Sequence, residues 1–312
     1  MAAYIVKRLA LTVPVVIGIL LVTFAIKALI PGDAVTAMYQ GQLSEQEAAE
    51  AIATMRAHYH LDRPWYEQFA LYAASVARGD LGESIRTRQP VLDEIGFRYL
   101  NTLKLTFAAL VVGILVGVSS GILAAYKKDS WLDVTAMTIS LFGISMPAFF
   151  SGLVVILVFA VWLQWLPVIG QGASGLILPA LTLGLIEAAP LARITRSSML
   201  DILGRDYIRA ARAKGLGETA VLLHHALPNA LLAVATIIGL QIGSLLGGAF
   251  IIEIIFGWRG IGELAVKAIQ WRDFTITQGV ILIGAGSYVF INLAIDLLYA
   301  WIDPRIDYGS RS

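Results

Sequence analysis

The sequence predicts an all-α membrane protein with six transmembrane helices and both termini in the cytoplasm. Of its 312 residues, 58% are apolar and only 14% are charged, whereas roughly 25% of the residues of a soluble domain are charged. The apolar residues gather in six runs of about 20 residues, the length that crosses a bilayer as a helix. Twelve Lys and Arg residues fall in the termini and the loops of one side, which assigns that side to the cytoplasm. This pattern excludes a soluble enzyme, a disordered chain and a nucleic-acid binder.

The six predicted spans are residues 9–30, about 103–125, about 134–163, 176–192, about 230–252 and 279–302. Lys7 and Arg8 precede the first run and would also fit the start of a signal peptide. The run is longer than the apolar part of a signal peptide, roughly 7–15 residues, and five further spans follow it. We therefore expect residues 1–30 to be a retained N-terminal transmembrane helix.

Residues 31–100 are predicted to form the only large segment outside the membrane. Ser44 and Glu47 have the spacing of a capping box and predict the start of a helix. A second helix is expected over 64–72, and the glycines in 79–82 indicate a turn. A segment of this size with few large apolar residues is too small for an independent core. We expect it to pack on the membrane domain or on a partner.

Residues 101–312 are predicted to form the core domain, in which two spans carry glycines at a spacing of four. These are Gly113, Gly117 and Gly121 in the second span and Gly239, Gly243 and Gly247 in the fifth. A spacing of four places the small residues on one helix face, so that another backbone can approach closely. The pattern predicts tight helix packing and leaves open whether the neighbour belongs to this chain or to a second subunit.

Four polar residues within the spans need an explanation: Glu187, Gln241, Asn292 and Asp296. A carboxylate at bilayer depth costs about 2.5–3.5 kcal/mol on insertion scales, so each should face a cavity or a partner. One interpretation is a translocation path or gate. The other is a hydrogen-bond network between helices, or, for Asp296, a position close to the cytoplasmic interface.

The longest predicted cytoplasmic loop, residues 193–229, has the pattern of a compact helix–turn–helix. A helix is expected over 201–214, with basic residues in its last turn and Gly215 as the stop that follows it. A second short helix is expected over 218–226, and Pro228 is expected to end it before the fifth span.

This loop carries a recognisable motif. Ala210-Ala211-x3-Gly215-x11-Leu227-Pro228 resembles the "EAA" loop of ABC-importer permeases, with Arg209 where many of them have Glu. The run DYIRAARAKG, residues 206–215, resembles the peptide-permease branch, in which that departure is usual. Further motifs that resemble this branch lie at 29–33, 78–84, 143–147, 239–253 and 303–305, although 258–260 reads Trp-Arg-Gly instead of Trp-Pro-Gly. The chain is thus similar to the B-type permease subunits of dipeptide, oligopeptide, glutathione and nickel ABC importers.

The resemblance implies a type I importer permease in the bacterial inner membrane. It implies three kinds of protein partner besides membrane lipid: a second, different permease subunit, two ATP-binding subunits, and an external solute-binding protein. The residues that it assigns to coupling with the ATPase are Asp206, Tyr207, Arg209, Ala210, Ala211, Arg212, Lys214, Gly215, Leu227 and Pro228. None of the seven lysines is followed by Ser or Thr, so the sequence contains no P-loop. We expect no catalytic residue, cofactor or metal site in this chain, and ATP and Mg in the partner subunits.

A peptide, of the dipeptide, oligopeptide or glutathione type, is the predicted cargo. The same class of importer for nickel or an opine-like solute is an alternative, because the absent binding protein does most of the selection. An ion-coupled secondary transporter is a weaker alternative, supported only by Glu187 between two prolines. A membrane-embedded enzyme would need clustered acid–base or metal-ligating residues, which the scattered histidines do not supply.

Overall fold

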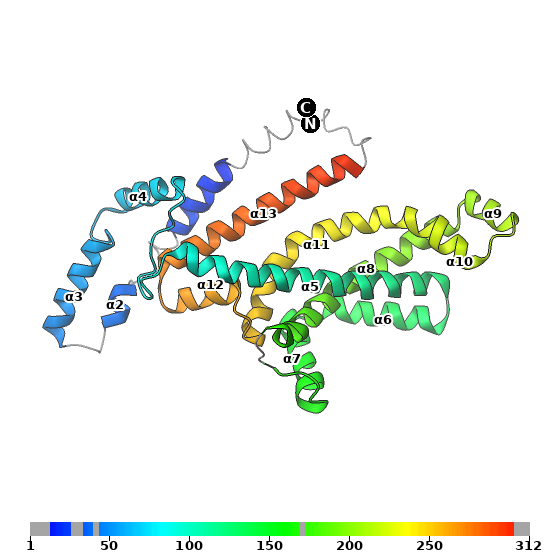
Figure 1. The fold of residues 1–312 in the computed structure, drawn as a ribbon, viewed down its shortest axis with the longest axis horizontal. Coiled ribbons are helices and arrows are strands. Elements are labelled where there is room, and N and C mark those ends of the chain that lie inside the picture. Colours follow the sequence, from blue (N-terminus) through cyan, green and yellow to red (C-terminus); the bar gives the residue numbers. More distant parts are fainter. Residues whose placement is uncertain (1–12, 26–33, 40–43, 169–171, 303–312) are drawn as a thin grey trace. The chain divides into compact units, whose positions relative to one another are not determined.

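The computed structural model describes residues 13–25, 34–39, 44–168 and 172–302, which are almost entirely helical (Figure 1). The chain divides into two compact units. The terminal unit comprises residues 1–101 and 259–312, and the central unit comprises residues 102–258. The all-α prediction is confirmed for the described ranges. The division differs from the predicted domains, because residues 259–312 group with the predicted external segment.

The central unit is built around two long helices, α8 and α11. Its elements are α5 (Val91–Tyr126, which begins in the terminal unit), α6 (Trp131–Ser145), α7 (Ala148–Val155), η1 (Ile156–Trp162), α8 (Ala173–Leu203), α9 (Asp206–Ala213), α10 (Glu218–Ala220), η2 (Val221–Ala226) and α11 (Leu227–Phe256). Leu105, Leu178, Leu245 and Ile252 are almost completely buried in one core cluster, to which α5, α8 and α11 contribute. These three helices therefore share one apolar core cluster.

The predicted third span is broken at Met146 and Pro147. The α6 and α7–η1 segments meet there at 116°. Proline disfavours helical geometry in the residue before it, and Met146 has the extended values φ −80° and ψ 131°. The spacing of apolar residues alone did not predict this bend.

The expected break at Pro228 is wrong. The described helix continues from Glu218 to Gly247 as one apolar segment of 30 residues. Pro228 lies in the first turn of α11, directly after the π-helical segment η2. Leu227, the residue before Pro228, keeps helical values of φ −58° and ψ −47°, so the helix passes through the proline without a break.

Four described helices are long and apolar enough to cross a membrane, and the bent α6–α7 pair would make a fifth span. The helix Val13–Ala25 lies inside the first predicted span, and the rest of that span is outside the described residues. The count of six spans and the position of the termini remain predictions.

The terminal unit contains the short helices of the predicted external segment. These are α2 (Ala34–Tyr39), α3 (Glu45–His58) and α4 (Trp65–Ala77); the unit also contains the helix Val13–Ala25, α12 (Ile261–Gln270) and α13 (Phe274–Ile302). The capping box is confirmed, because the Glu47 carboxylate accepts a 3.3 Å hydrogen bond from the Ser44 backbone N–H. The predicted turn is also confirmed, with φ of +80° at Gly79 and +79° at Gly82.

Candidate functional site

The candidate coupling loop is organised by the end of α9. The Leu216 N–H donates to the Ala211 carbonyl at 3.4 Å and the Gly215 N–H donates to the Arg212 carbonyl at 2.9 Å. These two bonds form a Schellman motif, which requires a left-handed residue after the helix. Gly215 supplies it with φ +85°, and a Cβ at this position would meet no atom within 4 Å. Glycine is therefore favoured at position 215 by the left-handed backbone conformation, and not by a lack of space for a side chain.

One face of α9 is packed against its neighbours within the central unit. Ile208 and Ala211 are buried in a cluster with Met199, Ile202, Val221, Leu222 and Ala226. Leu227 is half-buried against the same cluster, whereas Pro228 is exposed. The cluster fixes the orientation of α9 relative to the end of α8 and the start of α11. We predict that these helix ends lie on the cytoplasmic side. The helix begins at Asp206, later than predicted, because α8 extends as far as Leu203.

The opposite face of α9 is exposed and polar. Tyr207, Arg209, Ala210 and Lys214 are all exposed. Arg209 pairs with Asp206 at 3.3 Å, but both side chains are so exposed that the pair contributes little to stability. The exposed side thus presents Tyr207 and Arg209 on α9 and Lys214 directly after it, while the buried side holds the helix in place.

Arg212 closes the turn that follows α9. Its Nε and Nη2 donate to the two carboxylate oxygens of Glu218 at 2.7 and 3.2 Å. Such a bidentate pair has more defined geometry than a single contact. It links the last turn of α9 to the first residue of α10 across Gly215. Arg212 was among the predicted coupling residues, but its pairing with Glu218 was not predicted.

A second ion pair in the central unit was missed altogether. Arg196 on α8 donates from Nε and Nη2 to the two carboxylate oxygens of Asp133 on α6, both at 2.6 Å. The Asp133 side chain is only 4% exposed. An Arg near the end of a predicted transmembrane helix indicates that an acidic partner lies close by. The sequence alone does not show which acidic residue that partner is.

The glycine stripe of α5 packs against α8. A Cβ at Gly117 would lie 2.7 Å from the Ala188 carbonyl oxygen, and one at Gly121 would lie 2.6 Å from that of Ala192. At Gly113 the contact is looser, with the Gly184 oxygen 3.2 Å away. On α11, Gly239 and Gly243 are buried, whereas Gly247 is exposed with nothing within 4 Å of a Cβ. The neighbour of the α5 stripe thus belongs to this chain.

The polar membrane residues fall into two groups. Gln241 on α11 donates its Nε2 hydrogen to the backbone carbonyl of Glu187 on α8 at 2.9 Å, so these two residues meet. Gln241 Oε1 is buried without a hydrogen-bond partner among the described residues. Asn292 lies half-buried on α13 in the terminal unit, and the Asp296 side chain is outside the described residues.

A further buried carboxylate lies at the end of α11. Glu253 has no exposed surface and accepts a 2.5 Å hydrogen bond from the Thr102 hydroxyl on α5. Residue 253 lies just after the predicted fifth span, and no role was predicted for Glu253. Its position in the last turn of α11, three residues before Phe256, was therefore not predicted.

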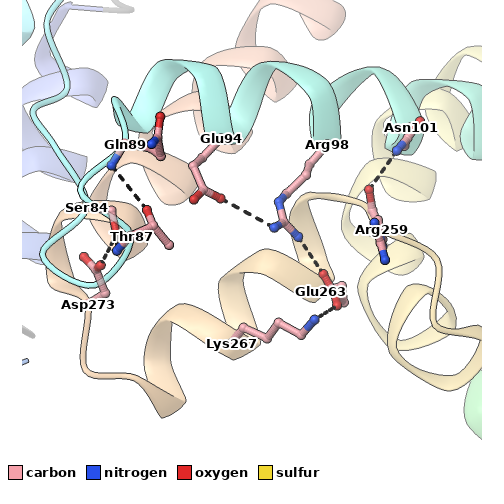
Figure 2. A network of polar contacts seen from close by, with 10 residues as sticks. All are labelled: Ser84, Thr87, Gln89, Glu94, Arg98, Asn101, Arg259, Glu263, Lys267 and Asp273. Carbon is pink, nitrogen blue, oxygen red and sulfur yellow. Dashed lines mark hydrogen bonds and ion pairs between the residues drawn. The ribbon is translucent and has the colours of Figure 1, made fainter. Parts of the chain in front are cut away.

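In the terminal unit, a chain of charges joins α5 to α12 (Figure 2). Arg98 contacts Glu263 at 2.8 Å and Glu94 at 3.5 Å, and Glu263 also pairs with Lys267. The Asn101 amide donates to the Arg259 carbonyl at 3.0 Å. These contacts hold the start of α5 against residues far away in the sequence.

A second polar contact in this unit joins the loop before α5 to the residue that precedes α13. The fully buried Asp273 accepts a 2.6 Å hydrogen bond from the Ser84 hydroxyl (Figure 2). It also accepts hydrogen bonds from the backbone N–H groups of Arg86 and Ile276. The loop at the end of the predicted external segment is therefore joined to the residue directly before α13.

Comparisons with known proteins agree with this architecture. Residues 113–308 match the family described as the inner membrane component of binding-protein-dependent transport systems. The chain is 42% identical to the dipeptide transport system permease protein DppB of Alkalihalophilus pseudofirmus, over 99% of this chain and 100% of that protein. It is 41% identical to the glutathione transport system permease protein GsiC of Escherichia coli K12, with the same coverage.

A structural relative shares the fold at lower sequence identity. A chain of the MetNI methionine ABC transporter in an inward-facing conformation has a TM-score of 0.57 and 20% sequence identity. The match covers 67% of this chain and 96% of the compared chain. At this identity the likeness concerns the fold alone.

Proposed function

Because this chain belongs to the family of inner membrane components of binding-protein-dependent transport systems, we propose that it is a permease subunit of an ATP-driven peptide importer. The chain is an integral, multi-pass protein of the inner membrane. The names of its full-length relatives specify a dipeptide and glutathione, which are both peptides. This agreement supports a short peptide as the cargo.

The structural observation that carries the proposal is the two-sided helix α9. One face is fixed by Ile208 and Ala211 in the core cluster, and the other exposes Tyr207, Arg209 and Lys214. A surface helix attached rigidly to the membrane helices can transmit the movement of a protein bound to its exposed face. We assign that face to contact with an ATP-binding subunit, which would bind ATP and Mg.

The proposed assembly contains one copy of this chain, a different permease subunit, two ATP-binding subunits and an external solute-binding protein. Closure of the ATP-binding pair would move α9, and with it α8 and α11, between inward- and outward-facing arrangements. Glu187 retains a half-exposed side chain where these helices cross. Its position supports a place for Glu187 and Gln241 along the translocation path, to which we also assign Asn292 and Asp296.

The coupling surface can be tested by site-directed cross-linking. The chain contains no cysteine, so Arg209→Cys introduces a unique thiol on the exposed face of α9. A short bifunctional thiol- and amine-reactive reagent should join this position to an ATP-binding subunit in the purified importer. Thr54→Cys, which is exposed on α3 in the predicted external segment, should give no such product. Equal cross-linking of both variants to the ATP-binding subunit would contradict the assignment.

The cargo can be tested with the reconstituted importer and its binding protein. Uptake of a radiolabelled dipeptide into proteoliposomes should depend on ATP and be inhibited by excess unlabelled dipeptide. Uptake of nickel or of an opine that excess dipeptide does not inhibit would favour the alternative cargo instead.

A further inference from the structure

The terminal unit contains a cavity of about 390 Å³ that the proposed coupling mechanism does not use. Its walls come from the helix Val13–Ala25, the end of α3, α4, the loop before α5 and the first turns of α13. Phe24, Leu71 and Phe274 supply apolar wall. A volume in this range falls within that of small-molecule sites, roughly 300–1,000 Å³.

Two buried polar atoms at this cavity lack hydrogen-bond partners among the described residues. They are the amide nitrogen Nε2 of Gln278 and the hydroxyl oxygen of Tyr72, and both residues line the cavity. The Gln278 residue is only 5% exposed. An unmade hydrogen bond of a buried group costs about 1–3 kcal/mol. A ligand that supplies an acceptor to Gln278 would recover that cost.

The charge state of the other lining groups restricts the ligand further. Burial raises the pKa of Tyr72 to about 12, so its phenol stays neutral and can donate or accept a hydrogen bond. Arg78 and Glu83, which carry opposite charges, also line the cavity. The cavity therefore combines apolar wall, an amide donor, a phenol, the imidazoles of His58 and His60, one guanidinium and one carboxylate. This combination matches a small molecule that has both an amine and a carboxylate as well as an apolar side chain.

We propose that this cavity is a binding subsite for a short peptide. A carbonyl or carboxylate oxygen of the peptide would accept the hydrogen bond from Gln278 Nε2, and an apolar side chain would pack against Phe24 and Phe274. The inference rests on the proposed function, because it takes the cargo to be a peptide. It adds a peptide site in the terminal unit, separate from the Glu187–Gln241 contact in the central unit.

The test measures binding of the tritiated dipeptide Ala-Phe to the complete importer in lipid nanodiscs, without ATP and without the binding protein. Gln278→Leu keeps similar volume and removes the donor, and should weaken binding about tenfold, equivalent to roughly 1.4 kcal/mol. Tyr72→Phe removes only a hydroxyl group and should weaken binding by a smaller factor. Gln46→Leu makes the same replacement at an exposed position of α3 outside the cavity and should bind as the wild type does.

Three outcomes would overturn the subsite. The first is no saturable binding to the wild-type importer, and the second is wild-type affinity in both Gln278→Leu and Tyr72→Phe. The third is unchanged dipeptide affinity together with weaker docking of the binding protein, which would make the cavity a protein contact. ATP-dependent dipeptide uptake by the wild type, measured in parallel, separates the two proposals. If uptake occurs, a negative binding result overturns the subsite alone, whereas lack of uptake overturns the proposed function.

Discussion

Replacing Gly215 by valine should uncouple ATP hydrolysis from uptake without preventing membrane insertion. Gly215 has φ +85°, and a Cβ there would meet nothing within 4 Å. The cost of the variant is therefore backbone strain, about 1–2 kcal/mol for a non-glycine residue in the left-handed region. A β-branched residue is especially unfavourable in this conformation.

The chain can relieve this strain only by changing the turn after α9. A negative φ at residue 215 would break the hydrogen bonds to the Ala211 and Arg212 carbonyls that end the helix. Arg212 and Lys214 would then lose their present orientation. A change of one to two kcal/mol corresponds to a factor of roughly 5–30 in population. We expect uptake per ATP hydrolysed to fall by a factor in this range.

Gly217 provides the matched control. It has φ −66° and also has open space around a Cβ, so Gly217→Val adds the same side chain without left-handed strain. Uptake and ATP hydrolysis should be measured with both variants in proteoliposomes that contain the complete importer. Wild-type uptake per ATP in Gly215→Val, or an equal loss in Gly217→Val, would refute the reasoning.

Three other predictions concern stability of the purified importer. Gly121→Ala places a Cβ 2.6 Å from atoms of α8 and should cost about 1–3 kcal/mol, lowering the Tm, whereas Gly247→Ala has open space and should not lower it. Asp133→Asn leaves Arg196 without its charged partner and should cost about 2 kcal/mol, less than a fully buried pair because Arg196 remains 25% exposed. Adding Arg196→Gln to Asp133→Asn should restore part of the lost stability in a denaturation experiment. A double variant that loses the sum of the two single stability losses would contradict the pairing. Asp273→Asn weakens the carboxylate acceptor of three hydrogen bonds, so limited proteolysis should cleave the loop before α5 faster than in the wild type. Cleavage at the wild-type rate would contradict this role of Asp273.

Local patterns predicted the elements of the chain well. The spacing of Ser44 and Glu47 predicted a helix start, and Gly215 predicted the end of α9, because both features act within a few residues. The four-residue spacing of the α5 glycines indicated a close helix contact, although it could not identify α8 as the neighbour.

Contacts between distant residues could not be predicted from one sequence. Asp133 pairs with Arg196 and Ser84 bonds to Asp273, but neither spacing carries a local signal. Proline chemistry was also ambiguous: Pro147 coincides with a sharp bend, whereas Pro228 lies in a helix that continues. The residue before each proline differs, because Met146 is extended whereas Leu227 is helical, and the apolar pattern does not show this difference.

The most direct test of the central claim is the energy source of uptake. Proteoliposomes with the complete importer, its binding protein and a radiolabelled dipeptide should be compared with ATP enclosed, with ADP enclosed, and with ATP plus a protonophore. We expect uptake with enclosed ATP, unchanged by the protonophore, and no uptake with enclosed ADP. Uptake that persists with ADP and collapses when the protonophore is added would contradict an ATP-driven importer and would favour an ion-coupled transporter.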